Sequence, residues 1–176
     1  MQALTVRHSS REFSPRKLPP SVLSKLLWAA FGINRAQTGG RTAPSAYNGD
    51  EIDVYVATAD GLFCYDARKH ALRHLPGQDI RASTGTEPDA DMAPVILVYI
   101  ADLSRIAKAT REEQARYAGT EAGFIAENVY LFCAAEELAT QVHGLGDRPR
   151  LAKLMTLAPD QQVILAQSVG YPAGTP

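Results

Sequence analysis

Residues 94–100 are a continuous apolar run of the length of one strand. Because no polar residue alternates with the apolar ones, this run predicts a central strand that is covered on both faces. Residues 51–58 alternate in the manner of a strand, and Asp60-Gly61 supplies a tight turn before a second strand at 62–66. This pattern predicts a β-hairpin. Further strands are expected at residues 70–75 and 162–169.

The segments between these strands favour helices. In residues 21–32 the apolar side chains recur at intervals of three and four, so we expect a helix with one buried face. Ser21 is its expected N-cap, and Trp28 is expected to pack in the core. A charged helix is expected at 103–117. Residues 119–139 are apolar almost all round, which is typical of a helix in a domain centre or at a subunit interface. A last helix is expected at residues 149–157.

This order of elements predicts one α+β domain over residues 1–176, with a mixed, mostly antiparallel central sheet flanked by helices. Three connections are irregular. Residues 32–48 form a long loop without periodicity, a kind of segment that is often functional. Residues 78–91 are polar and are expected to form a loop or a short helix. Residues 140–147 read as a glycine-bearing connection.

Composition narrows the function classes. The chain has a net charge of −1, which argues against a diffuse nucleic-acid-binding surface, so any affinity for phosphate must be local. The apolar runs are far shorter than the roughly 20 residues that span a bilayer. We therefore expect no membrane partner and a cytoplasmic protein. A native leader, if one was removed, would instead direct the protein to the periplasm or outside the cell.

The cysteines and histidines give no sign of a metal site. Cys64 and Cys133 both lie within apolar runs, so we expect buried free thiols. The four histidines lack the spacing of metal ligands, and no metal is expected.

Two guanidinium groups, an imidazole and two hydroxyl groups are concentrated in residues 7–11, which read Arg7-His8-Ser9-Ser10-Arg11. Arginine presents planar, permanently charged donors that match phosphate oxygens, and hydroxyl groups add short uncharged donors. The segment predicts a local site for a phosphate or another polyanion. A solvated cluster of charges is the alternative interpretation of so short a motif.

Taken together, several segments resemble the FMN-dependent nitroreductases. Residues 7–11 are similar to the N-terminal phosphate-binding motif of that family, and residues 44–48, Pro44-Ser45-Ala46-Tyr47-Asn48, resemble its second motif, which lies under the isoalloxazine ring. A long helix over 123–139, a glycine-bearing loop and a strand that ends at Gly170-Tyr171-Pro172 resemble the C-terminal half of the family.

The resemblance implies a homodimer with two FMN sites at the subunit interface, each built from both subunits, and a long buried helix at that interface. It implies a ping-pong reaction in which hydride passes from NAD(P)H through flavin N5 to an organic acceptor such as a nitroaromatic or a quinone. No side chain need act as a nucleophile, because the flavin carries the chemistry. The implied cofactor-binding residues are Arg7, His8, Ser9, Arg11, Arg41, Pro44, Ser45, Ala46, Asn48, Gly144, Leu145 and Gly146.

The chain departs from the family pattern in two places. Gly49-Asp50-Glu51 follows Asn48, where the family often continues with Gln-Pro one residue later. No basic residue follows Lys153, so phosphate binding would fall more heavily on residues 7–11. The run 39–46 is closer to the SagB-type branch, which leaves a dehydrogenase of peptide heterocycles as an alternative. A flavin-binding protein without turnover is a further alternative.

Overall fold

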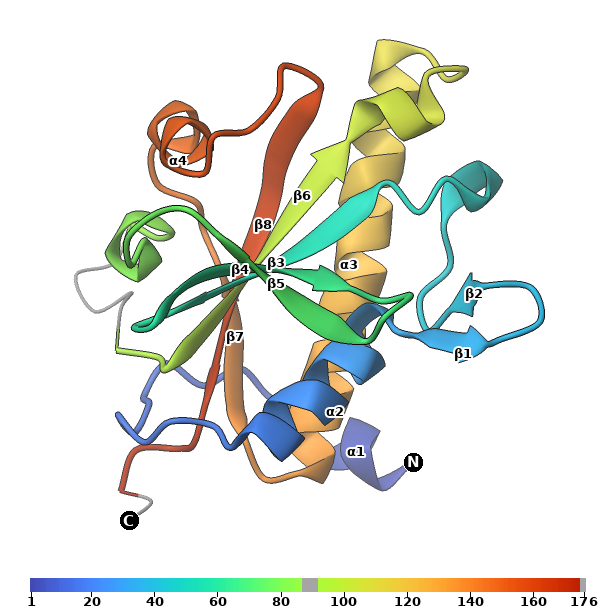
Figure 1. Cartoon of the computed structure of the whole chain (residues 1–176). Coiled ribbons are helices and arrows are strands. Elements are labelled where there is room, and N and C mark those ends of the chain that lie inside the picture. Colours follow the sequence, from blue (N-terminus) through green and yellow to red (C-terminus); the bar gives the residue numbers. More distant parts are fainter. Residues whose placement is uncertain (87–91, 175–176) are drawn as a thin grey trace.

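The computed structural model describes residues 1–86 and 92–174, and its main feature is a six-stranded sheet (Figure 1). The spatial order is β5-β4-β3-β6-β8-β7, and each of these neighbouring pairs is antiparallel. The α+β class and the antiparallel sheet with flanking helices are thus confirmed. The strands are β3 (Ile52–Thr58), β4 (Gly61–Asp66), β5 (Ala71–Leu75), β6 (Val95–Asp102), β7 (Ala139–His143) and β8 (Gln161–Gly170).

The run predicted as the central strand is β6, which lies between β3 and β8. Its side chains alternate between two cores. Tyr99 packs in a core with residues of α2 (Pro20–Phe31) and α3 (Arg111–Ala135). Val98 faces the opposite side and packs in a core with Leu151 of α4 (Arg148–Leu154). Because both faces of the sheet are covered, the side chains on both faces of β6 are apolar and do not alternate with polar ones.

α3 is one helix where two were expected. It begins at a capping box, in which the Thr110 side chain accepts the Glu113 N–H and the Glu113 carboxylate accepts the Thr110 N–H. Residues Leu103–Ile106 form a separate 3-10 turn, η3. The helix continues through Gly119 because a glycine destabilises a helix by only about 1 kcal/mol, which is less than the free energy gained when the buried face of the helix packs. The buried stripe of α3 comprises Ala118, Glu121, Ala122, Ile125, Ala126, Val129 and Cys133.

Two expectations for α2 are wrong. The helix begins at Pro20 with Pro19 as N-cap, not at Ser21, because the fixed backbone angle of proline suits the first helical turn. Trp28 is 47% exposed. Its indole N–H donates to the Ile33 carbonyl at 3.1 Å, so the polar end of the ring is bonded just beyond the helix end.

Several short elements were not predicted. They are α1 (Gln2–Val6), the hairpin of β1 (Ile33–Arg35) with β2 (Gly40–Arg41), the 3-10 turn η1 (Ala46–Asn48), and strand β7 in the expected connection 140–147. The 3-10 turn η2 (Arg81–Ser83) agrees with the short helix that was one of the two expectations for residues 78–91. Of the expected polar segment 78–91, residues 87–91 lie outside the described residues. Cys64 and Cys133 are buried free thiols, as predicted.

The N-terminal segment runs along one side of the sheet. Ser10 N–H donates to the Thr140 carbonyl of β7, an edge strand, at 3.0 Å. Further along, Ser14 N–H donates to the Tyr171 carbonyl at 2.9 Å. Because β7 has no strand on its outer side, the Ser10 contact places this part of the segment where another strand would otherwise lie, whereas Phe13 and Ser14 pair with residues that follow β8.

Candidate functional site

Tyr130 of α3 contacts two residues of the basic N-terminal segment, Arg7 and Ser9. The Arg7 guanidinium carbon lies 5.2 Å from the centre of the Tyr130 ring, a cation–π contact. The Tyr130 hydroxyl accepts the Val142 N–H at 2.9 Å and lies 3.0 Å from Ser9 Oγ. Since the phenol oxygen accepts from Val142, its own hydrogen is available to Ser9. One side chain therefore ties Arg7 and Ser9 to β7, the strand that leads into residues 144–146.

The remaining residues of this group lie on the surface or at its edge. His8 is exposed, and its Nδ1 lies 2.9 Å from the Val6 carbonyl. Arg11 is exposed and Gly144 is open to solvent. Leu145 packs against the core that contains Leu151, which anchors the connection 144–146. Arg11 and the backbone at Gly144 are thus accessible, while Leu145 holds the connection in place.

The 44–48 loop lies against the other half of α3. Ser45 Oγ donates to Glu51 Oε2 at 3.0 Å and accepts the Asp50 N–H at 2.7 Å. Tyr47 and Asn48 have left-handed backbones, with φ of 56° and 52°. The Tyr47 ring packs edge-on against Tyr117 of α3, with centroids 5.7 Å apart. Pro44, Tyr47 and Asn48 are exposed and Ala46 is half-buried, so the loop presents both apolar and polar groups on its outer surface.

Arg41, predicted to reach the pyrimidine edge of a flavin, already has partners. Its Nε donates to Asp50 Oδ2 at 3.2 Å, and its Nη1 donates to the Phe31 carbonyl at 3.0 Å. The guanidinium carbon also lies 4.6 Å from the centre of the Phe31 ring. A flavin contact by Arg41 would compete with these bonds, and its role stays a prediction.

The structure divides the predicted site residues into two groups. Arg7, Ser9 and the strand before Gly144 meet at Tyr130, whereas the 44–48 loop meets α3 near Tyr117 and Glu121. Glu121 and Tyr130 are nine positions apart in α3, which is about 14 Å along a helix. Figure 1 shows α1 and the β1–β2 hairpin, which flank the two groups, at different heights along this helix.

Beneath the 44–48 loop lie two buried acids that sequence reasoning missed. Glu51 is 0% exposed and Glu121 is 2% exposed. Ile52 N–H donates to Glu121 Oε1 at 3.3 Å. Burial, followed by the hydrogen bond with Glu51, raises the pKa of Glu121 to about 8. The sequence did contain one signal, since Glu121 falls on the helical stripe of Ala118 and Ala122.

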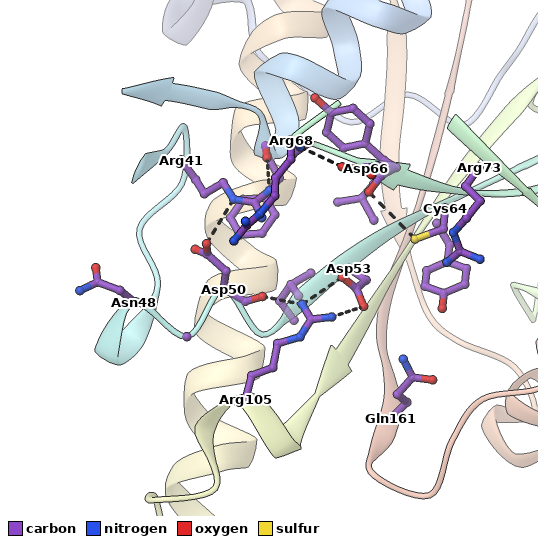
Figure 2. Close-up of a pocket in the computed structure, with 17 residues that line it drawn as sticks. Arg41, Asn48, Asp50, Asp53, Cys64, Asp66, Arg68, Arg73, Arg105 and Gln161 are labelled. Atoms are coloured by element: carbon purple, nitrogen blue, oxygen red, sulfur yellow. Dashed lines mark hydrogen bonds and ion pairs between the residues drawn. The ribbon is translucent and has the colours of Figure 1, made fainter. Parts of the chain in front are cut away.

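A polar cavity of about 610 Å³ adjoins the 44–48 loop and is lined by Asn48 and Asp50 among others (Figure 2). Arg105 binds Asp53 through two hydrogen bonds of 2.7 and 3.0 Å, and Arg41 binds Asp50, so these charges are paired.

Two further residues of the cavity carry ionisable groups. Burial raises the pKa of the Cys64 thiol to about 11 and that of Tyr55 to about 12. Both groups are therefore neutral at pH 7, and neither is a thiolate or phenolate nucleophile.

Within residues 1–86 and 92–174, no group of three or more His, Cys, Asp or Glu side chains is arranged to hold a metal ion. In the same part of the chain, no helix is both long enough and apolar enough to cross a membrane.

Comparison with known proteins identifies the family of the chain. The Nitroreductase family model matches residues 4–171. A solved structure of a candidate nitroreductase from Ralstonia eutropha JMP134 has a TM-score of 0.94 and 41% identity, covering 99% of this chain and 83% of that chain.

More distant relatives are also similar to this chain. A candidate nitroreductase from Methanocaldococcus jannaschii is 27% identical over 147 residues, 78% of this chain and 74% of the relative. A chain of the E. coli microcin synthetase McbBCD complex, solved with truncated pro-MccB17 bound, shares the fold with a TM-score of 0.81 at 21% identity, over 93% of this chain and 68% of that chain. With a family match over residues 4–171 and a fold common to all these structures, the chain belongs to the Nitroreductase family.

Proposed function

We propose that this protein is an FMN-dependent oxidoreductase that transfers hydride from NAD(P)H to an organic acceptor, a nitroaromatic, a quinone or a similar compound, in a ping-pong reaction. Family membership supports an oxidoreductase. When bound, FMN would supply the N5 atom through which the hydride passes. The contribution of the protein is to bind the cofactor, orient the two substrates and exclude water.

The donors around Tyr130 fit the phosphate end of FMN. Arg7 and Arg11 would supply the charge, and Ser9 and His8 would supply uncharged donors. The backbone of residues 144–146 would lie near the ring, because β7 leads from the Tyr130 contact directly into this connection. The single observation that carries the proposal is this convergence of Arg7, Ser9 and β7 on one tyrosine.

The 44–48 loop fits the same cofactor only from a second copy of the chain. An FMN whose phosphate lies beside Arg7 would have to extend along α3 to reach Asn48 of the same chain, where Ser45 and Arg41 are engaged in internal bonds. We propose a homodimer in which residues 7–11 and 144–146 of one subunit face residues 44–48 of the other. Pro44, Ala46 and Asn48 would then contact the flavin through their exposed surface.

A mixed dimer tests this arrangement. An Arg7→Ala/Arg11→Ala variant and a Pro44→Gly/Asn48→Ala variant are each expected to bind FMN weakly as homodimers. When the two are co-expressed with different tags and the mixed dimer is isolated, a site shared between subunits leaves one intact site, so one FMN per dimer is expected. A site contained within one chain leaves none. Wild-type protein that stays colourless after FMN is supplied and desalted would contradict the proposal as a whole.

A dehydrogenase of peptide heterocycles is the second candidate, favoured by the resemblance of residues 39–46 to the SagB-type branch. The microcin synthetase chain agrees with it at the level of the fold. The two activities differ in the electron donor, so anaerobic mixing of the FMN-loaded protein with NADH or NADPH separates them. Rapid bleaching of the flavin supports the first candidate. Flavin that is reduced no faster than free FMN supports the second candidate or a binding protein without turnover.

A further inference from the structure

Two carboxyl groups are enclosed together under the 44–48 loop. Glu51 follows the loop and Glu121 comes from the middle of α3, and both side chains are almost fully buried. The cost of an ionised carboxylate away from water is large unless a cation or several donors compensate it. Two such charges side by side would also repel each other.

No cation compensates them among the interactions that act on Glu121. Those interactions come from Glu51, the Ser45 hydroxyl and the Ile52 N–H. The arginines on neighbouring elements are occupied elsewhere: Arg41 of β2 pairs with Asp50, and Arg105 of η3 pairs with Asp53 and Asp102. One of the two carboxyl groups must therefore be protonated, which lowers the charge of the pair.

The hydrogen bonds show which carboxyl oxygens of the pair have a donor and which do not. Of the four carboxyl oxygens, Glu51 Oε2 accepts from Ser45 Oγ and Glu121 Oε1 accepts from Ile52 N–H. The other two, Glu51 Oε1 and Glu121 Oε2, are buried and have no donor within the described part of the chain. A single proton between the two carboxyl groups satisfies both oxygens at once, because a protonated carboxyl donates and a carboxylate accepts.

All four oxygens have partners whichever acid holds this proton, and the raised pKa of Glu121 assigns the proton to that residue. With the proton on Glu121, the Glu51 carboxylate accepts two O–H donors, from Ser45 and from Glu121. Glu121 then accepts from Ile52 N–H with one oxygen and donates with the other. Every oxygen of the pair has a partner in this arrangement.

We propose that Glu121 is a positioning residue whose proton, shared with Glu51, holds the 44–48 loop in the shape that contacts the flavin. The connection runs through Ser45, which bonds Glu51 with its hydrogen and Asp50 N–H with its oxygen. Loss of the proton leaves two buried carboxylates, and the repulsion between them would displace Glu51 and with it Ser45. This inference rests on the proposed function for its link to FMN, but the shared proton itself does not depend on it.

The test compares the wild type with Glu121→Gln and with Glu127→Gln, the same change at an exposed glutamate of the same helix. A glutamine at position 121 accepts Ile52 N–H with its oxygen and donates to Glu51 with its amide, at any pH. In FMN-free wild-type protein labelled with ¹³C at the glutamate carboxyl carbons, we expect one carboxyl to titrate near pH 8, where burial and Glu51 set the pKa of Glu121. That signal is expected to vanish in Glu121→Gln and to remain in Glu127→Gln.

The second measurement is the dissociation constant of FMN from pH 6 to pH 9.5. Because one proton is linked to the shape of the loop, wild type and Glu127→Gln are expected to lose affinity above about pH 8, by up to about tenfold per pH unit. Glu121→Gln is expected to bind FMN with a flat profile across this range.

Three results would overturn the inference. They are a wild type in which every glutamate titrates in the ordinary range, a loss of affinity in Glu121→Gln with the same slope as in wild type, and a carboxyl signal that responds to Na⁺ or K⁺ instead of pH. Failure of all variants to bind FMN would contradict the proposed function, and the carboxyl titration would still decide whether the proton is shared.

Discussion

The two halves of α3 serve two different kinds of site. Near its N-terminal half, the 44–48 loop rests on enclosed acids, and its polar groups bond to one another. Near its C-terminal half, Tyr130 contacts the half-buried Arg7, and Arg11 further along the same segment is exposed. A buried cluster without spare donors fixes a shape, whereas exposed guanidinium groups are available to a ligand. The contrast suggests that one half of the helix determines the shape of the site and the other half determines its affinity for anions.

The largest effect is expected from Glu121→Leu. Leucine removes the proton donor and leaves the Glu51 carboxylate buried with a single donor from Ser45. Leaving a buried group without its hydrogen-bond partner costs about 1–3 kcal/mol, and more when the group is charged. Urea unfolding of the FMN-free protein measures this change in the free energy of unfolding. Glu127→Leu, the same substitution at an exposed position of α3, is the control and is expected to cost far less. Equal losses in the two variants would show that the acid pair has no special part in stability.

A smaller effect is expected from removing one cation at the other half. Arg7→Ala or Arg11→Ala is expected to weaken FMN binding by about 1.5–3 kcal/mol, the range for a hydrogen bond to a charged group. The free energy of unfolding should change much less, because Arg11 is exposed and Arg7 is half-buried with only a cation–π contact to lose. Fluorescence titration with FMN measures the affinity. Unchanged affinity in both variants would mean that other residues hold the phosphate.

Tyr130→Phe tests whether the tyrosine hydroxyl holds the residues near the C-terminal half of α3 in place. The substitution keeps the ring beneath Arg7 but removes the hydroxyl that accepts Val142 N–H and contacts Ser9. A loss of about 0.5–1.5 kcal/mol is expected in the free energy of unfolding. FMN affinity should fall as well, but by less than in Arg7→Ala. A variant with reduced stability and full FMN affinity would separate Tyr130 from the binding of phosphate.

The smallest effect is expected from Asp50→Asn, which breaks the ion pair with Arg41 at 3.2 Å. Both side chains are partly exposed, and ion pairs of this kind contribute about 0–1 kcal/mol. Asparagine also tolerates the left-handed backbone at this position, where φ is 45°. Urea unfolding at the same pH as for Glu121→Leu allows a direct comparison. If Asp50→Asn lowered the free energy of unfolding as much as Glu121→Leu does, the ion pair and not the acid pair would be the main support of the loop.

The main strands and helices could be predicted because their signals are local. The uninterrupted run of β6 and the turn at Asp60-Gly61 each contain enough information in a few residues. β7 was missed because its five residues, Ala139–His143, follow the helix almost directly and lie beside glycines. α3 was divided at Gly119 because local propensity disfavours glycine, whereas packing over the full stripe decides the outcome.

The site was only partly predictable for a related reason. The composition of residues 7–11 and 44–48 is visible in the sequence, and these segments led to the family that the comparisons established. The contacts that support them are not local: Tyr130 is 121 residues from Ser9, and Glu121 accepts the Ile52 N–H. A single sequence offers no sign that such distant residues meet. The assignment of individual flavin contacts remains a prediction.

The position of the N-terminal segment along β7 has a consequence for protein engineering. β7 is an edge strand, and its outward groups are occupied by Ser10 N–H at the Thr140 carbonyl and by the Tyr130 hydroxyl at Val142 N–H. A version of the chain that starts after Ser14 would therefore lose more than its cations. It would leave the Thr140 carbonyl open to strands of other molecules, so such a truncation is expected to aggregate.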